Sequence, residues 1–475
     1  MANILGALEV AKRALLAQQL AQEVTGHNIA NANTEGYSRQ QAVMVTTRPY
    51  ANPTFQSRTT PGQVGTGVKI STIRRFRDDF LDLEIRKEKA DLGSWEAKHK
   101  LYGELEVIFA EPQDTGFNKV LNDFWNSWQE LSVNPENFAI RSQLKEQAIT
   151  LTTAINQIDQ NLRDIRLDIN EEIKVKVQEV NSLATQIKDL NDQIAKVELS
   201  GDKANDYRDK RDLLLDKLSK IVNIDYNEMD NGMVYVRVGG RTLVSGMFLH
   251  KLEARHSNYE AQMVEVYWEN THDKPLLTTG ELKGLFEARD KIVPHYQNML
   301  DDFSKTLINE VNKVHREGYG MADSILSPPP ERDFFKGDSA ANIHVNDDIV
   351  FDPNLIAASK SGQAGDGRIA LKIAQLQNTL FDIGTKRNIT FSQYYQGMVA
   401  DLGTEAQRSK RMTENQDMLV KKLENYKESY SGVSLDEETS NMLKYQHAYN
   451  AAARFMTTID EMLTKLIEGT GRVGR

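Results

Sequence analysis

A long apolar stripe in the middle of the chain limits the possible folds more than any other feature. From residue 151 to residue 169, leucine and isoleucine recur at alternating spacings of four and three, and the stripe continues to Ile194. This is the period of an α-helix with one apolar face. Mixed charges fill the intervening positions, as expected for side chains that face solvent. The sequence therefore predicts one very long helix, packed in the manner of a coiled coil.

The composition excludes several classes of protein. A chain of 475 residues is long enough for several domains, and its formal net charge of -10 disfavours binding to nucleic acid. Because cysteine is absent, disulfides and thiolate sites are excluded. Lys12 and Arg13 interrupt the apolar N-terminal region, so we expect no signal peptide of the cleaved kind. We also expect no membrane span.

Both ends of the chain carry narrower apolar stripes. The N-terminal stripe comprises Ile4, Leu8, Ala11 and Leu15. The C-terminal stripe follows a heptad phase and comprises Met442, Tyr445, Tyr449, Ala452, Met456, Ile459, Leu463 and Leu466. Such stripes most often form one wall of a domain's own core. Here two isolated helices would bury little, so we expect them to pair as a coiled coil and to gain stability against other copies.

A turn follows the first helix, in the segment HNIANANTEGY. Its amides and its flexible positions are Asn28, Asn31, Asn33 and Gly36, and Tyr37 closes the segment. Amide side chains donate and accept hydrogen bonds at once, so they suit contacts between neighbouring copies. A capped turn within one chain is the alternative, and the residues alone leave both open.

The remaining patterns divide the chain into three parts. Residues 1–40 and 433–475 form the predicted terminal domain, and residues 41–220 and 281–432 form a helical, rod-like core. Residues 221–280 change to a period of two, which predicts a small β-rich outer domain. Residues 318–367 are rich in Gly, Pro and Asp and predict a surface insert with one strand at 343–351. The expected fold is mainly α with a smaller β-rich part, elongated and multi-domain.

Signatures of catalysis are missing. We find no zinc-protease histidine pair, phosphate-binding loop or nucleophile elbow, and expect no catalytic, cofactor-binding or metal site. Asp209, Asp212 and Asp216 recur at spacings of three and four, which we interpret as one solvated helix face. The charged helix predicted from residue 391 to residue 430 is expected to pack beside the long central helix. The chain is predicted not to be an enzyme.

The two ends together resemble a known family. The stretch LGALEVAKRALLAQQLAQEVTGHNIANANTEGYSRQ resembles the N-terminal signature of the bacterial flagellar rod, hook and hook-associated axial proteins. The stretch SLDEETSNMLKYQHAYNAAARFMTTIDEMLTKLI is similar to its C-terminal partner, with Glu438, Gln446 and Arg454 in place. We count Gln446 among the assembly residues. The helical central region is similar to the hook-associated members of this family.

The resemblance implies a structural subunit that is exported by the flagellar type III apparatus and secreted to the extracellular flagellum. It implies a position at the junction between hook and filament, with self-assembly into a helical homo-oligomer through the terminal helices. The implied partners are the hook protein, hook-associated protein 3 and an export chaperone at the C-terminal region. Two alternatives stay open, namely another axial subunit of the rod or hook and a cytoplasmic coiled-coil scaffold.

Overall fold

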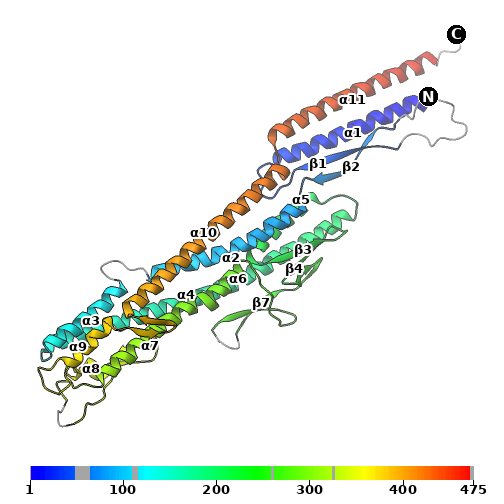
Figure 1. Cartoon of the computed structure of the whole chain (residues 1–475). Helices are drawn as coiled ribbons and strands as arrows, with labels where there is room; N and C mark the ends of the chain where they lie inside the picture. The colour runs from blue at the N-terminus through cyan, green and yellow to red at the C-terminus, as the bar shows by residue number, and fades with distance from the viewer. Residues whose placement is uncertain (1, 49–64, 110–115, 258–261, 324–326, 471–475) are drawn as a thin grey trace.

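The protein is elongated, with its two ends side by side at one extremity (Figure 1). The computed structural model describes residues 2–48, 65–109, 116–257, 262–323 and 327–470. Helices dominate, and the strands form one four-stranded sheet and several two-stranded ones. This confirms the predicted class, mainly α with a smaller β part. The architecture divides into a terminal unit and a core.

The terminal unit consists of two helices and a hairpin. α1 (Ala2–Ala30) lies along α11 (Leu435–Thr470). β1 (Gln40–Thr46) and β2 (Val68–Arg75) pair in antiparallel fashion and also pack on α1 (Figure 1). Small and β-branched residues of α1 and β1 form a small cluster there, namely Ala21, Val24 and Ala42, with Tyr445 of α11 against it. α1 is therefore covered by a helix and by a two-stranded sheet.

The core is built along one long helix. α4 (Phe138–Glu198) has 61 residues and buries nearly all of the stripe predicted from the sequence. That stripe meets α3 (Phe117–Val133), then α7 (Val293–His315), and finally α5 (Asn205–Ile221). The burial is as expected, but the partner is a succession of elements rather than one coiled-coil helix.

The predicted β-rich region, residues 221–280, contains six strands of the described chain. They are β3 (Ile224–Glu228), β4 (Val234–Val238), β5 (Arg241–Ser245), β6 (Phe248–Leu249), β7 (Leu252–His256) and β8 (Val264–Trp268). β3 to β6 form an antiparallel sheet in sequence order, and β7 pairs with β8. Their inward side chains belong to the same buried cluster as α4, because valines such as Val236 and Val264 pack against the helices. The sheets thus share the core of the helical part.

Asparagines on α4 hold the strand edges in place. Asn181 exchanges two hydrogen bonds with the backbone of Leu252, at 2.7 and 2.9 Å. Asn191 does the same with Val234, at 3.0 and 3.1 Å. An amide side chain offers the donor and acceptor of a peptide group, so each asparagine replaces a missing neighbouring strand. These contacts fix the register of the sheets on the helix.

The loop-rich region differs from the prediction in two ways. The strand predicted at 343–351 is wrong beyond β10 (His344–Val345), because the Asn346 side chain accepts from Asp348 N and starts α8 (Asp347–Phe351). The region is also more than a surface insert. Phe334 is buried beside Trp128, with ring centroids 5.0 Å apart. Other short elements here are β9 (Phe335–Lys336) and α9 (Arg368–Gln375).

Two further helices connect the core to the terminal unit. α2 (Asp79–Phe109) and α10 (Phe391–Ser431) pack along each other (Figure 1). The prediction that this last core helix lies beside the long central helix is therefore wrong. A π-helical turn, Ala288–Ile292, joins α6 (Glu281–Glu287) to α7, and β11 (Phe381–Ile383) and β12 (Lys386–Ile389) precede α10. The chain bends at residues 432–434 between α10 and α11.

Candidate assembly site

The two predicted end stripes come together in the terminal unit. Ala11 of α1 and Ile459 of α11 are buried. Most other predicted stripe residues are half-buried, namely Ile4, Leu8, Leu15, Met442, Tyr445, Tyr449, Ala452, Met456 and Leu463. Gln446 and Leu466 are exposed. The pair thus makes a shallow seam that covers its own apolar residues only in part.

A second set of apolar side chains on α11 flanks the seam beside Ile459 and stays partly exposed. Phe455 is 49% exposed, Met462 is 54% exposed, and Leu466 follows four residues later. Spacings of seven and four place these three on one face, which we call the outer stripe. Leu443 and Ile467 are also exposed on other faces of α11. Sequence reasoning missed Phe455 and Met462, because each lies directly beside a residue of the stronger heptad seam.

Asn28 locks the turn after α1. Its Nδ2 donates to Gln40 O and to Glu438 Oε2, at 2.9 and 2.8 Å. Its Oδ1 accepts from Gln40 N and from the Tyr37 hydroxyl, at 3.0 and 2.8 Å. Both donors and both acceptor positions of the amide are therefore used within the chain, which leaves this side chain nothing for a neighbouring copy.

Glu438 connects the two ends of the sequence. It lies in the first turn of α11, is 2% exposed, and accepts from Asn28 and from Arg39 Nη2, which lies 2.7 Å from its Oε1. The Arg39 backbone N–H donates to Ser431 O at the end of α10. We call Asn28, Arg39 and Glu438 the clasp, since they fasten the N-terminal turn to the bend between α10 and α11.

The other residues predicted in this turn are less enclosed. Asn31 is half-buried and donates to His27 O, whereas Asn33 is exposed. Gly36 has φ +78°, and a Cβ there would stand 3.3 Å from Leu213 Cβ. This backbone region favours glycine, so Gly36 is explained by the turn itself. Burial raises the pKa of Tyr37, and nearby carboxylates of Asp206, Asp209 and Glu438 add to the effect.

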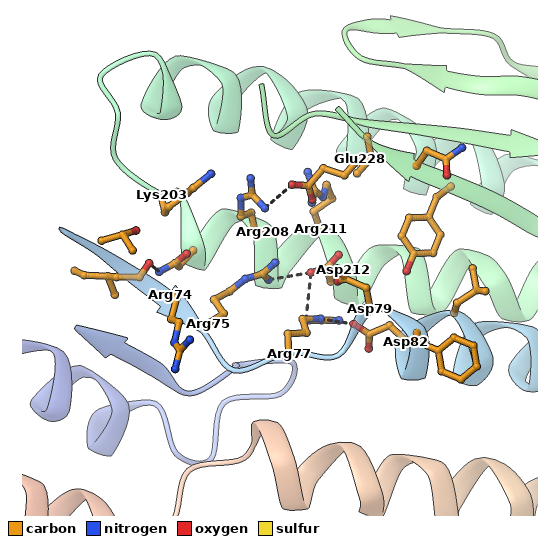
Figure 2. A pocket seen from close by; sticks show the side chains of 18 residues that line it. Arg74, Arg75, Arg77, Asp79, Asp82, Lys203, Arg208, Arg211, Asp212 and Glu228 are labelled. Atoms are coloured by element: carbon orange, nitrogen blue, oxygen red, sulfur yellow. Dashed lines mark hydrogen bonds and ion pairs between the residues drawn. The ribbon is translucent and has the colours of Figure 1, made fainter. Parts of the chain in front are cut away.

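Buried ion pairs join the terminal unit to the core. They involve β2, the segment after it, α2 and α5, and the residues are Arg75, Arg77, Arg86, Asp82, Asp209, Asp212 and Asp216, which we call the joint cluster. Figure 2 shows Arg75, Arg77, Asp82 and Asp212 of this cluster. Arg75 Nη1 lies 2.7 Å from Asp209 Oδ1 and 2.9 Å from Asp212 Oδ2. Arg86 Nε lies 2.7 Å from Asp216 Oδ1. Ser38 N also donates to Asp209.

The joint cluster corrects one prediction from the sequence. Asp209, Asp212 and Asp216 are buried, so the interpretation as a solvated face is wrong. The spacing located the helix face, but no pattern on α5 shows that arginines from β2 and α2 cover it. Burial alone would raise the pKa of Asp212, but the guanidinium groups of Arg77, Arg75 and Arg86 outweigh it and hold that pKa well below its usual range.

Asp209 behaves differently from its neighbours. Burial raises its pKa above the ordinary value, although Arg75 and the Ser38 N–H oppose that rise. The Asp216 carboxyl has a lowered pKa, because Arg86 and Lys427 outweigh the cost of its burial. The joint cluster therefore holds carboxylates that depend on their arginines for the charged form.

Within the described ranges, no group of three or more metal-ligating side chains could hold an ion. Among the helices described, none combines the length and the apolar character that crossing a membrane requires.

Comparison with known proteins gives the class first. Residues 8–37 match the model of flagella basal body rod proteins, and residues 428–468 match the C-terminal model of flagellar basal body rod FlgEFG proteins. These segments contain Asn28 and Glu438 of the clasp and most of the α1 and α11 seam. The terminal unit is therefore that of a flagellar axial protein.

The particular family follows from the whole chain. Residues 102–335 match the helical domain of flagellar hook-associated protein FlgK. The chain is 33% identical to flagellar hook-associated protein 1 of Bacillus subtilis, over 98% of this chain and 99% of that protein. The Escherichia coli protein of the same name is 24% identical, over 95% of this chain. The chain belongs to the flagellar hook-associated protein 1 family, which decides against the rod or hook subunit and the cytoplasmic scaffold.

A solved structure supports the fold independently. The flagellar hook junction protein FlgK from Burkholderia pseudomallei superposes with a TM-score of 0.63 at 14% identity. The match covers 74% of this chain and 100% of that structure. At this identity the likeness concerns the fold alone.

Proposed function

We propose that this chain is the structural subunit between the flagellar hook and the filament, and that it assembles through its terminal unit. The observation that carries the proposal is the outer stripe of α11, which stays exposed after α1 and α11 have paired. Apolar surface of this kind on a paired helix is suited to burial against neighbouring copies. The role is mechanical rather than catalytic.

Assembly follows from the incomplete packing of the terminal unit. Each copy presents the partly covered seam and the outer stripe, and burial of apolar area contributes roughly 25 cal/mol per Å². This contribution is available only where neighbouring copies or the hook supply the opposite surface. Asn31 and Asn33 remain proposed contacts between copies, whereas Asn28 belongs to the clasp.

The finer assignments are part of the proposal. Residues 1–40 and 433–475 provide the assembly helices, and the hairpin of β1 and β2 packs on them. The rest of residues 41–220 and 281–432 forms the rod-like body, and residues 221–280 face outward. The subunit is exported by the type III route to the extracellular flagellum. It contacts the hook protein on one side and hook-associated protein 3 on the other, and an export chaperone binds its C-terminal region before export.

Immunogold electron microscopy of isolated flagella tests the position. The antibody is raised against residues 221–280, and a strain that lacks the gene serves as the control. We expect label in one narrow band between hook and filament, and filaments lost from the deletion strain. Label along the whole hook or at the rod, with filaments retained in the deletion strain, would contradict the junction role.

A further inference from the structure

The terminal unit and the core each have an apolar cluster of their own. The small cluster of the terminal unit consists of Ala21, Val24 and Ala42, with partly buried residues of β1, β2 and α11 packed on it. The large cluster contains the buried apolar side chains of the core helices and of the outer sheets. Among the described residues, no side chain belongs to both clusters. The apolar packing of one unit is therefore not completed by the other.

The contacts between the two units are mainly polar, and the start of α5 makes most of them. Asp209 accepts from Ser38 N at 2.9 Å and from Arg75 Nη1 at 2.7 Å. Asn205 Nδ2 donates to Gln40 Oε1 at 3.1 Å. We call the residues of these contacts the latch, namely Ser38, Gln40, Arg75, Asn205, Asp206 and Asp209.

Polar contacts of this kind separate at a lower cost than an apolar core. When a charged or amide group leaves its partner, water takes the partner's place, so the net contribution of such a contact is modest. The half-buried side chain of Leu213 also lies at this interface, beside Gly36, but glycine offers it no side chain to pack against. Separation of the two units therefore leaves both apolar clusters covered.

The packing between the units is also incomplete. Two adjoining hollows, of about 660 and 430 Å³, lie between β2 and the start of α5. Thr72 and Ile73 line both of them from β2, and Asn205 lines both from α5. Figure 2 shows the larger hollow, with Arg75 and Asp212 paired beside it. Because protein interiors are closely packed, openings of this size leave room for one unit to turn on the other.

Two short segments of the described chain connect the units. They are residues 76–78, between β2 and α2, and residues 432–434, between α10 and α11, and neither is helix or strand. The Arg39 backbone bonds both connections, since Phe76 N donates to Arg39 O and Arg39 N donates to Ser431 O, each at 2.8 Å. Arg77 stays with the core, where it pairs with Asp82. Both connections therefore meet at one place, beside Arg39.

We infer that the terminal unit is mounted on the core by a hinge at Arg39 and these two connections, and that the latch holds the hinge closed in the single chain. Opening separates β2 from α5 and turns the terminal unit as a rigid body. Interfaces within one chain that are small and polar permit relative motion of this kind. The hinge itself does not depend on the proposed function. Its consequence does, namely that the core changes direction in the assembly while the assembly helices keep their contacts.

Distances between spin labels in the purified full chain test the hinge. Because the chain contains no cysteine, labels attach only at cysteines that are introduced, and exposed positions are available in both units. Electron paramagnetic resonance then gives the distribution of distances for each labelled pair. The pair between the units is Gln446→Cys with Lys217→Cys, the pair within the terminal unit is Lys12→Cys with Gln446→Cys, and the pair within the core is Lys217→Cys with Gln193→Cys.

The latch variant carries Gln40→Ala and Asp209→Ala. The first substitution removes only a side chain, so the backbone bonds of residue 40 to Asn28 remain. The matched control carries Gln157→Ala and Asp168→Ala, at exposed positions of α4. We expect one narrow distribution between the units in the parent and the control, and a distribution about twofold wider in the latch variant. Both pairs within a unit should stay unchanged.

Three results would overturn the inference. A distribution between the units that keeps its width in the latch variant, or that is already as wide in the parent, would mean that the latch does not hold the terminal unit. Widening of the pairs within a unit would mean local unfolding instead of rotation about a hinge. None of these results bears on the junction role, which the immunogold label tests separately.

Discussion

The core and the terminal unit bury their helices to very different degrees. Along α4, apolar side chains such as Leu151, Ile173 and Ile187 are fully buried. On α11, Ile459 is the one buried apolar residue among the described side chains, and Phe455 and Met462 are about half exposed. A helix that packs this poorly gains little from its own chain. The comparison contrasts a core whose helices are covered within one copy with a terminal unit whose apolar residues are covered only in part.

The two regions are connected by buried charged side chains, and not by apolar packing. The joint cluster buries arginines and aspartates instead of apolar side chains, and the clasp buries Glu438. Buried ion pairs contribute uncertain net stability, but they have strict geometry, and losing one partner is costly. We therefore interpret the joint as the part that sets how the terminal unit is oriented on the core.

The largest expected effect comes from breaking this joint. Asp212→Ala leaves Arg75, Arg77 and Arg86 without their shared carboxylate, so we expect a loss of about 3 to 5 kcal/mol in the free energy of unfolding. Urea unfolding followed by circular dichroism measures it. Asp202→Ala, at an exposed position before α5, is the control and should change little. A loss below about 1 kcal/mol in the first variant would refute the coupling.

The core contains a buried histidine whose protonation is coupled to folding. His315 is buried, accepts from Ala357 N and bonds Arg332 O, and burial lowers its pKa from 6.5 to about 4. The unfolded chain therefore binds the proton first, so stability falls as the pH drops from about 6.5 to about 4. The expected loss is about 3 kcal/mol over that window.

Unfolding at pH 7, 5.5 and 4.5 tests this prediction. His315→Gln keeps a donor and an acceptor but does not titrate there, so its stability should vary less across the window. If the variant and the parent protein lose stability in parallel, other groups carry the pH dependence. The buried carboxylates of Asp212 and Asp216 have lowered pKa values, so they lose charge only under more acidic conditions.

A smaller effect is expected where the sheets meet the long helix. Asn191→Ala leaves the backbone N–H and C=O of Val234 and the Gly246 C=O without these hydrogen bonds, which costs about 1 to 3 kcal/mol. Gln160→Ala, at an exposed position of α4, is the control. Hydrogen exchange should show faster exchange in β4 in the first variant alone. Unchanged exchange there would mean that the asparagine does not hold the strand.

The sequence predicted the elements that a periodic pattern of apolar residues reveals. The α4 stripe and the alternating strands are local patterns, and the structure has them where they were expected. It did not predict which distant residues would meet. Asp209 to Asp216 were assigned to solvent, since their arginine partners lie more than a hundred residues away on β2 and α2. Long-range ion pairs leave no local period that a single sequence could reveal.

The residues of the candidate assembly site were also predicted only in part. The heptad phase identified Ile459 and Leu463, because they lie on the stronger stripe. Phe455 and Met462 were not predicted, because the exposure of an apolar residue depends on which neighbouring elements cover it in the folded chain. The pairing of Glu438 with Asn28 joins residues 410 positions apart, and it required the structure.

The smallest effect on stability is expected for a substitution on the outer stripe. This substitution tests the difference between the core and the terminal unit most directly. Phe455→Glu removes an exposed side chain, so the free energy of unfolding of the monomer should change by no more than about 0.5 kcal/mol. In cells, the same variant should be secreted but fail to enter flagella, because a carboxylate would be buried against a neighbour without a partner. Western blots of the medium and of isolated flagella measure both.

The matched control for this prediction is Thr457→Glu, which adds the same charge two positions further on, at an exposed site turned about 200° around the helix. If both variants assemble normally, the terminal unit does not use the outer stripe, and its partly covered seam must be the surface that meets other copies. If Phe455→Glu also unfolds the monomer, α11 is held by its own chain far more firmly than its burial indicates. The core and the terminal unit would then differ in shape, and not in how fully each is stabilised within one copy.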